Sequence, residues 1–261
     1  MFKNAQDLTG CAIGATDGVV GEVEDLYFDD QQWTVRYLVV VTGAWLNARK
    51  VLIHPRSLGP ADWSRRLLPA EITMQQVRGA PDIDTNKPVS RQHETLFLSH
   101  YRHPRYWQSA AVPTITANPS VQTLDPQLGW SQEQFARAVN AQDQGREGSE
   151  QHLRSSHAVL NYAVRAEDAD IGHVQGLLFA EEDWAIRYLV VRTGHWWHGR
   201  QILLAVQWIR SVSWLDSCFT VDLSRETLRD APLYDPHVPL SRAKEIELFK
   251  YFGRTGYWHP G

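Results

Sequence analysis

His195 and His198 are the side chains whose type and spacing best suit metal chemistry in this chain. They follow an apolar stretch that ends at Thr193, so we expect them in the turn after a strand. Zinc sites normally use three or four protein ligands, and no cysteine or carboxylate accompanies this pair. The sequence therefore favours two polar residues on an exposed turn over a metal site, and we expect no bound cofactor.

The chain contains one pattern twice, and this repeat decides how the candidate residues are interpreted. The segment from Trp33 to Gly43 reads WTVRYLVVVTG, and the segment from Trp184 to Gly194 reads WAIRYLVVRTG. The offset is 184 − 33 = 151 residues, and it continues without a gap to the pairs Tyr106-Trp107 and Tyr257-Trp258. Each copy is long enough to form a small domain, which predicts an internal duplication.

The repeat divides the chain into two domains and a linker. We predict the first domain at residues 1–107 and the second at residues 151–261, each ending in helices. Residues 108–150 have no counterpart and are rich in Pro, Gln, Ala, Ser and Asn, which is typical of a linker. Because such a linker lets the copies meet, we expect them to pack against each other within one chain or in a homodimer.

The conspicuous histidines do not recur between the copies. The first copy has Ala44 and Asn47 where the second has the candidate metal pair. Three further histidines lie on the predicted helix near the end of the first copy: His93, His100 and His103. Their counterparts are Lys244, Tyr251 and Arg254. Cations and an aromatic ring suit a solvated helix face, so the sequence favours that interpretation over a second metal site.

Several charged and tryptophan side chains do recur. The retained pairs are Arg36 with Arg187, Arg49 with Arg200 and Trp45 with Trp196, and the charges of Asp17, Arg78, Asp84 and Arg91 recur as well. A single active site does not need each charge in both copies, so we predict structural roles for them. Arg36 interrupts an apolar strand and is expected to have a carboxylate or backbone partner.

Each copy predicts short strands that close into a small barrel. The retained apolar positions change parity between Val23 and Leu26, which predicts a β-bulge in that strand, and the second copy has Gly176 there. Short strands at regular spacing with glycine turns are typical of a small β-barrel. The expected fold is therefore mainly β with some α: two small barrels, each followed by short helices.

Two short helices follow the strands in each copy. Thr73 and Ser224 are the predicted N-caps of the first helix, and a second helix begins at Ser90 or Ser241. A glutamate, Glu94 or Glu245, lies in its first turns, where a carboxylate suits the helix dipole.

Composition and motifs narrow the function classes. The chain has 261 residues and a formal net charge of −4, which gives no overall attraction to nucleic acid. Cys11 and Cys218 do not correspond in the repeat, and we expect two buried, reduced thiols. No signal peptide or membrane-spanning apolar run is present, so we expect a cytoplasmic protein. We find no nucleotide-binding, metallohydrolase or nucleophile-elbow motif and expect no enzymatic activity.

The strands resemble a known family. The Gly-x-Val strand, the acidic turn, Trp-x-x-Arg-Tyr-Leu-Val-Val, Thr-Gly-x-Trp and the following Val-Leu-Ile strand are similar to the PRC-barrel domain. That domain occurs in the cytoplasmic part of the photosynthetic reaction-centre H subunit and in free-standing bacterial proteins. The resemblance covers residues 5–107 and 156–258. It implies a compact β-barrel that binds other proteins, without a catalytic set.

Three functions are compatible with these features. The first is a non-catalytic adaptor or scaffold whose protein partners the sequence does not identify. The second is a regulatory module whose groove between the barrels takes a small ligand or metal, near His195, His198 or the tryptophans. The third is a peripheral partner of a membrane complex such as a reaction centre, without a transmembrane segment of its own.

Overall fold

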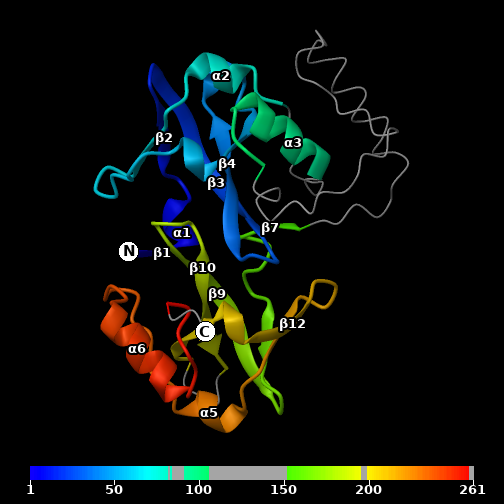
Figure 1. Ribbon diagram of the computed structural model, residues 1–261, viewed down its shortest axis with the longest axis vertical. Helices are drawn as coiled ribbons and strands as arrows, with labels where there is room; N and C mark the ends of the chain where they lie inside the picture. The colour runs from blue at the N-terminus through cyan, green and yellow to red at the C-terminus, as the bar shows by residue number, and fades with distance from the viewer. Residues whose placement is uncertain (82, 84–90, 106–151, 195–198, 259–261) are drawn as a thin grey trace, which may run out of the picture.

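The computed structural model describes residues 1–81, 83, 91–105, 152–194 and 199–258. Over these residues the protein is mainly β, with two sheets and a few short helices. One sheet has six strands and the other has seven. They follow each other along the long axis of the molecule (Figure 1). The predicted predominance of β structure is therefore confirmed.

The six-stranded sheet runs in the order β5-β4-β3-β2-β6, and β7 pairs with β3 outside that path. Its strands are β2 (Ala12–Ala15), β3 (Gly18–Asp29), β4 (Thr34–Thr42), β5 (Lys50–Ile53), β6 (Leu67–Pro69) and β7 (Leu153–Ser155). The register of β3 against β4 shifts between Val23 and Asp25, so the predicted bulge is confirmed. Strand β4 is buried on both faces from Val35 to Val40, which explains its nearly continuous apolar sequence.

The seven-stranded sheet runs in the order β11-β10-β9-β8-β13-β12, and β1 pairs with β9 outside that path. Its strands are β1 (Phe2–Asn4), β8 (Ala163–Arg165), β9 (Asp170–Ala180), β10 (Ile186–Thr193), β11 (Gln201–Ala205), β12 (Ile209–Ser213) and β13 (Cys218–Val221). The register of β9 against β10 shifts between Gly176 and Val174, at the position equivalent to the shift in β3.

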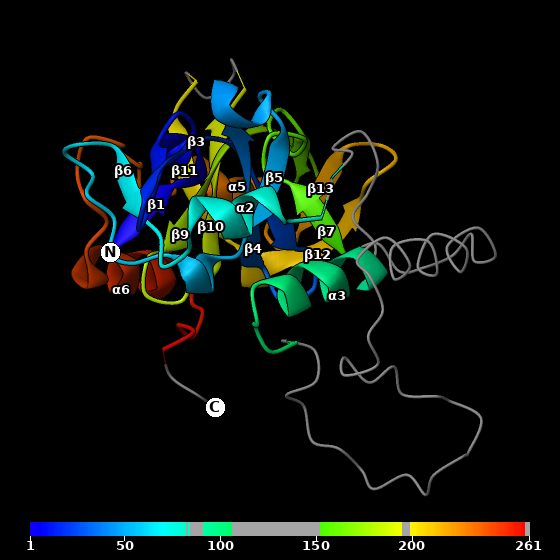
Figure 2. The same cartoon turned by 90° about the horizontal axis from the view of Figure 1, so that it is seen from above.

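Short helices cover the ends of both sheets. The α-helices are α1 (Ala5–Leu8), α2 (Met74–Arg78), α3 (Arg91–His100), α5 (Arg225–Arg229) and α6 (Arg242–Tyr251), and the 3₁₀ turns are η1 (Ala44–Leu46), η2 (Pro55–Ser57) and η5 (Val206–Trp208). The side chains of Thr73 and Ser224 accept from the backbone of their helices, so these two predicted N-caps are confirmed, and Ser241 caps α6 in the same way. Seen from above, α3 and α6 both lie toward the same edge of the molecule (Figure 2). None of the described helices is both long and apolar enough to cross a membrane.

Each sheet takes one strand from the other part of the repeat. β1 pairs with β9 and places Phe2 opposite Ala180, while β7 pairs with β3 and places Leu153 opposite Asp29. The offset of 151 residues relates Phe2 to Leu153, and it also relates Asp29 to Ala180. The exchange is therefore reciprocal, position by position, and each sheet contains residues from both predicted domains.

The exchanged strands carry cations that contact tryptophans at equivalent positions. Lys3 Nζ lies 4.4 Å from the ring centroid of Trp63, and the Arg154 guanidinium carbon lies 4.2 Å from that of Trp214. Arg154 Nε also donates to Asp30 Oδ2 at 2.8 Å, and Asp30 directly follows β3, the strand with which β7 pairs. A strand of three residues is too short to be stable by its ladder alone, so these contacts help to hold it in place.

The halves meet where β4 and β10 begin. Thr34 and Ala185 form an isolated antiparallel bridge, and they are themselves 151 residues apart. Flanking backbone hydrogen bonds run from Val35 N to Trp184 O at 2.9 Å and from Ile186 N to Trp33 O at 2.6 Å. Thr34 thus pairs with its own counterpart, and the two flanking hydrogen bonds join equivalent pairs of residues, which is the geometry of a twofold interface.

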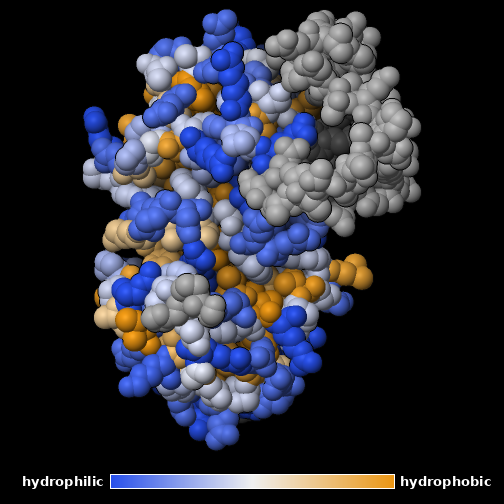
Figure 3. Space-filling view, in the orientation of Figure 1, coloured by the Kyte–Doolittle hydropathy of each residue, from blue (hydrophilic) through white to orange (hydrophobic). Residues whose placement is uncertain are grey.

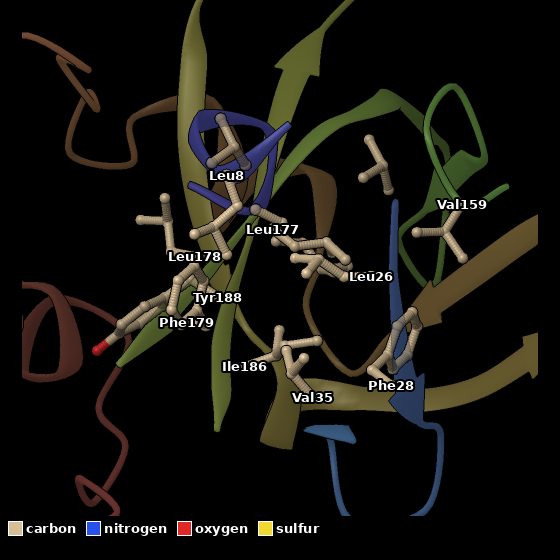
Figure 4. Packing of buried hydrophobic residues seen from close by; sticks show 14 of the residues in the cluster. Leu8, Leu26, Phe28, Val35, Val159, Leu177, Leu178, Phe179, Ile186 and Tyr188 are labelled. Atoms are coloured by element: carbon tan, nitrogen blue, oxygen red, sulfur yellow. The ribbon is translucent and has the colours of Figure 1, made fainter. Parts of the chain in front are cut away.

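One hydrophobic core passes through this junction. Val35 and Ile186 lie side by side between the ribbons of the two halves, and both are buried (Figure 4). Burying a side chain of this size contributes about 1.5–3 kcal/mol, so separated halves would expose costly apolar surface. Cys11 and Cys218 are buried and unlinked, as predicted.

Two glycines are required where the central strands cross closely. A Cβ on Gly21 would overlap the carbonyl oxygen of Val41 on β4, and a Cβ on Gly172 would overlap that of Arg192 on β10. In both cases the obstacle is backbone within a paired ladder, which cannot rotate away as a side chain can.

Candidate functional site

Several predicted site residues fall outside the described part of the chain. His195, Trp196 and His198 are among them, so the prediction that the two histidines are polar residues on an exposed turn stays untested. The backbone of α3 is described, but the side chain of His93 is not. Within residues 1–81, 83, 91–105, 152–194 and 199–258, no three His, Cys, Asp or Glu side chains lie close enough together to hold a metal ion.

The retained arginines of the central strands contact polar groups in the turn before each strand. Arg36 Nη2 lies 3.9 Å from Asp29 Oδ2, and the same nitrogen donates to the Gln32 side chain. Arg187 forms an ion pair with Asp183, which is the counterpart of Gln32. The carboxylate partner expected for Arg36 is thus present. Both arginines use the acceptor four residues earlier, whereas the Asp29 carboxylate has no counterpart, because Ala180 stands at that position.

Arg49 and Trp45 attach a loop to the first sheet. Arg49 Nη2 donates to Ala80 O at 2.6 Å, and Trp45 Nε1 donates to Val20 O at 2.8 Å. The carbonyl of Arg200 accepts from the Thr193 hydroxyl at 3.2 Å, and that of Arg49 accepts from the Thr42 hydroxyl at 2.9 Å. All of these hydrogen bonds end on backbone carbonyl groups, so the contacts stabilise the positions of loops and strands.

Asp17 and its counterpart Asp168 have the same structural role. Asp17 Oδ1 accepts from Met74 N at 2.8 Å, and Asp168 Oδ1 accepts from Arg225 N at 2.8 Å. Each carboxylate therefore binds a free backbone N–H at the start of a helix, where negative charge is favoured.

A pocket lies at the junction of the halves. It has a volume of about 180 Å³ and is lined by Gln32, Trp33, Ile186, Arg187, Ala205, Val206, Gln207 and Tyr257. Gln32 and Trp33 come from the turn before β4, whereas the other lining residues belong to the second half. The pocket exists only because the two halves are joined, so no motif within one copy could reveal it.

A buried hydrogen-bond network supports the pocket wall. Glu245, which is 1% exposed, accepts from the Tyr188 hydroxyl at 2.6 Å and from the Tyr257 hydroxyl at 2.9 Å. Arg242 Nη1 lies 2.8 Å from the other carboxylate oxygen of Glu245. Burial raises the pKa of Tyr188, and its hydrogen bond to Glu245 acts in the same direction. The sequence suggested only a helix-dipole role for Glu245, whereas its burial shows that it organises the ring of Tyr257.

The first half contains a histidine cluster that the sequence did not reveal. The ring of His54 lies 5.2 Å from that of His103, and His103 Nε2 lies 2.7 Å from Ser57 Oγ. His54 Nδ1 accepts from Arg56 N at 3.0 Å. Burial is the largest cause that lowers the pKa of His54, and together with the neighbouring His103, Arg56 and Arg36 it brings this pKa to about 3.

A hydroxyl beside an imidazole is the starting arrangement for nucleophilic catalysis, but Ser57 is only 4% exposed. A side chain buried to this extent is out of reach of a substrate in this structure. The contact instead fastens the end of α3 to the turn η2. In the second half Ala205, Trp208 and Arg254 occupy the positions of His54, Ser57 and His103. In the second half the small Ala205 stands where the first half has the imidazole of His54, and the large Trp208 stands where it has Ser57. These replacements explain why only the first half shows the cluster.

Asp25 clasps the exchanged strand β7. Its side chain accepts from Ser155 Oγ at 2.5 Å, from Ser156 Oγ at 2.8 Å and from His157 N at 3.2 Å. In the other exchange Gly176 replaces Asp25, and a Cβ there would meet the amide of Asn4. The two exchanged strands are therefore held differently: the Asp25 carboxylate binds β7, whereas the absence of a side chain at Gly176 leaves room for the Asn4 amide at the end of β1.

Replacing Asp25 with alanine is expected to lower the free energy of unfolding by about 2–3 kcal/mol, because several donors lose a charged acceptor in a mostly buried site. Urea denaturation of the full chain would measure this. The matched control is Asp170→Ala, which removes an ion pair with Arg165 whose partners are 79% and 56% exposed. That control should change stability by less than about 0.5 kcal/mol, and equal losses in both variants would contradict the clasp.

Comparison with known proteins adds no relative to these observations: no family model and no curated protein matches the chain.

Proposed function

We propose that this chain is a tandem PRC-barrel protein that arose by internal duplication and acts as a non-catalytic adaptor or scaffold for other proteins. The repeated strand sequence supports the family, and the reciprocal strand exchange supports a duplication of an ancestral dimer. Among the retained charges, Arg36, Arg187, Arg49, Asp17 and Asp168 make backbone hydrogen bonds or ion pairs through their side chains, which supports a structural role for these residues.

The observation that carries the adaptor role is a difference between the surfaces of the two halves. Among the described residues, the large apolar side chains that are exposed in the second half are Leu215, Leu233, Val238, Ile246 and Tyr251, whereas the first half exposes Met1 and Val19. Leu215 is 96% exposed at the tip of the β12–β13 hairpin. Apolar surface is visible on the second half in the view of Figure 3.

The repeat shows that this apolar character is not needed for folding. The first half has Ser64 where the second has Leu215, and Thr95 where the second has Ile246. Both halves form their sheets, so these apolar residues serve something other than the core. Leu215 lies in the β12–β13 hairpin and Ile246 on α6, and these two elements lie on opposite sides of the second half (Figure 1). Exposed apolar side chains that the fold does not need are candidates for contacts with other proteins.

The test replaces exposed residues of one half with the residues that the other half has at the equivalent positions. Partners captured from the source organism would be purified, and their affinity for the full chain would be measured by calorimetry. The variant Leu215→Ser with Ile246→Thr, which inserts first-half residues, should weaken binding about tenfold or more. The control Val19→Asp, which inserts the second-half residue, should leave it unchanged. A purified partner that binds all three chains equally would refute a role of Leu215 and Ile246 in partner binding.

A further inference from the structure

The pocket at the junction has the size and lining of a small-molecule site, and the adaptor role does not require it. Its volume of about 180 Å³ compares with the roughly 150 Å³ of an engineered cavity that admits benzene. We propose that this pocket binds a small carboxylate built on a single ring, with the carboxylate on Arg187 and the ring against the apolar wall.

The charge of the lining selects an anion. Among the described residues that line the pocket, Arg187 is the only charged one, and Gln32 and Gln207 add neutral amides. A guanidinium has five donors in a planar fork that matches a carboxylate. The ion pair with Asp183 engages Nη2, so donors remain for a second carboxylate.

Arg187 is also held in position before a ligand arrives. Its guanidinium carbon lies 4.3 Å from the ring centroid of Tyr257. The Tyr257 hydroxyl is fixed in turn by Glu245 at 2.9 Å and by Arg242 at 3.0 Å. A cation whose side chain is already ordered loses less conformational entropy on binding, which favours affinity for a small ligand.

The remaining wall suits a ring. Trp33, Ile186, Ala205 and Val206 present aromatic and aliphatic surface. Trp33 stacks on Phe28 with ring centroids 5.5 Å apart, so the indole is fixed. A flat ring beside a fixed indole gains stacking contacts that an aliphatic acid lacks.

The first half lacks the same combination of residues. It has His54, Pro55 and Arg56 where the pocket has Ala205, Val206 and Gln207. Replacement of imidazole by a methyl group and of guanidinium by a shorter amide leaves more space in the second half. The proposal therefore applies to one side of the junction.

The experiment is titration of the full chain with sodium benzoate, followed by calorimetry and ligand-observed NMR. We expect saturable binding with a Kd of about 1 mM, which is typical for a ligand of this size. Gln207→Glu, which places a second carboxylate beside Arg187 at an exposed position, should weaken binding about tenfold or more. Ala205→Leu, which fills the pocket, should abolish it. Uncharged benzamide should bind about tenfold more weakly than benzoate.

The control variant is Gln75→Glu, which makes the same charge change on the exposed side of α2. Benzoate should bind this variant as it binds the wild-type chain. The proposal fails if benzoate shows no saturable binding, if Gln207→Glu binds it with unchanged affinity, or if benzamide binds equally well. None of these outcomes bears on the partner contacts proposed at Leu215 and Ile246, so the two proposals are tested separately.

Discussion

Replacing Gly21 with alanine should destabilise the folded chain by more than about 3 kcal/mol, because the new methyl group overlaps the Val41 carbonyl inside the central β3–β4 ladder. Neither strand can move aside, since β4 is buried on both faces and pairs with β5 as well. Gly172→Ala should have a similar effect through Arg192 on β10. The free energy of unfolding in urea is the measurement, with circular dichroism at 25 °C to show how much native chain remains.

Two other glycines provide matched controls. A Cβ at Gly59 or at Gly194 would meet its nearest neighbour at 3.8 Å, which is ordinary van der Waals contact, and neither residue has a positive φ. Gly59→Ala and Gly194→Ala should therefore change stability by less than about 1 kcal/mol. A loss at Gly59 as large as that at Gly21 would show that the close strand crossing is not the cause.

Acidification from pH 7 to pH 5 should cost the wild-type chain about 2 kcal/mol of stability through His54 alone. This histidine titrates near its ordinary pKa of 6.5 when unfolded and at about 3 when folded. As pH falls, the unfolded chain binds the proton first, so stability is full above about pH 6.5 and falls progressively toward pH 3. Burial of the ring is the main reason that protonation of His54 is unfavourable in the folded state, and the neighbouring His103, Arg56 and Arg36 act in the same direction.

The second half supplies the variant that tests this effect. His54→Ala combined with Ser57→Trp inserts the residues that the second half has at these positions, Ala205 and Trp208, neither of which titrates. The double variant should lose about 2 kcal/mol less than wild type between pH 7 and pH 5, measured by urea denaturation at both pH values. An identical pH dependence of the two chains would show that His54 is not the acid-sensitive group.

The local features of the fold could be predicted from the sequence because each depends on neighbours along the chain. The bulge after Val23 follows from a change of apolar parity, and the caps at Thr73 and Ser224 follow from a hydroxyl before a helix. The buried strand β4 follows from its apolar run. In each case a few consecutive residues contain the whole physical cause.

The candidate sites were predicted less well, because their members are distant in sequence. The histidines on the first helix were interpreted as a solvated face, but His103 contacts the buried turn at Ser57. The sequence around His54 contains no signal of a site, because this histidine stands alone between a strand and a proline. The pocket combines Trp33 with Arg187, and no spacing rule applies to residues from opposite halves.

The predominance of β structure, the 151-residue repeat, the caps at Thr73 and Ser224 and the identity of the retained charges follow from the order of residues along the chain. The exchange of β1 and β7, the hydrogen bonds of Asp25 to β7, the close approach of Asn4 to Gly176 and the pocket beside Arg187 depend on contacts between residues that are far apart in the sequence. A repeated sequence makes the strands of the two halves similar. The apolar pattern of β1 or β7 is therefore compatible with pairing in either sheet. The choice between them depends on the apolar surface buried at the junction, which exists only when both halves are folded together.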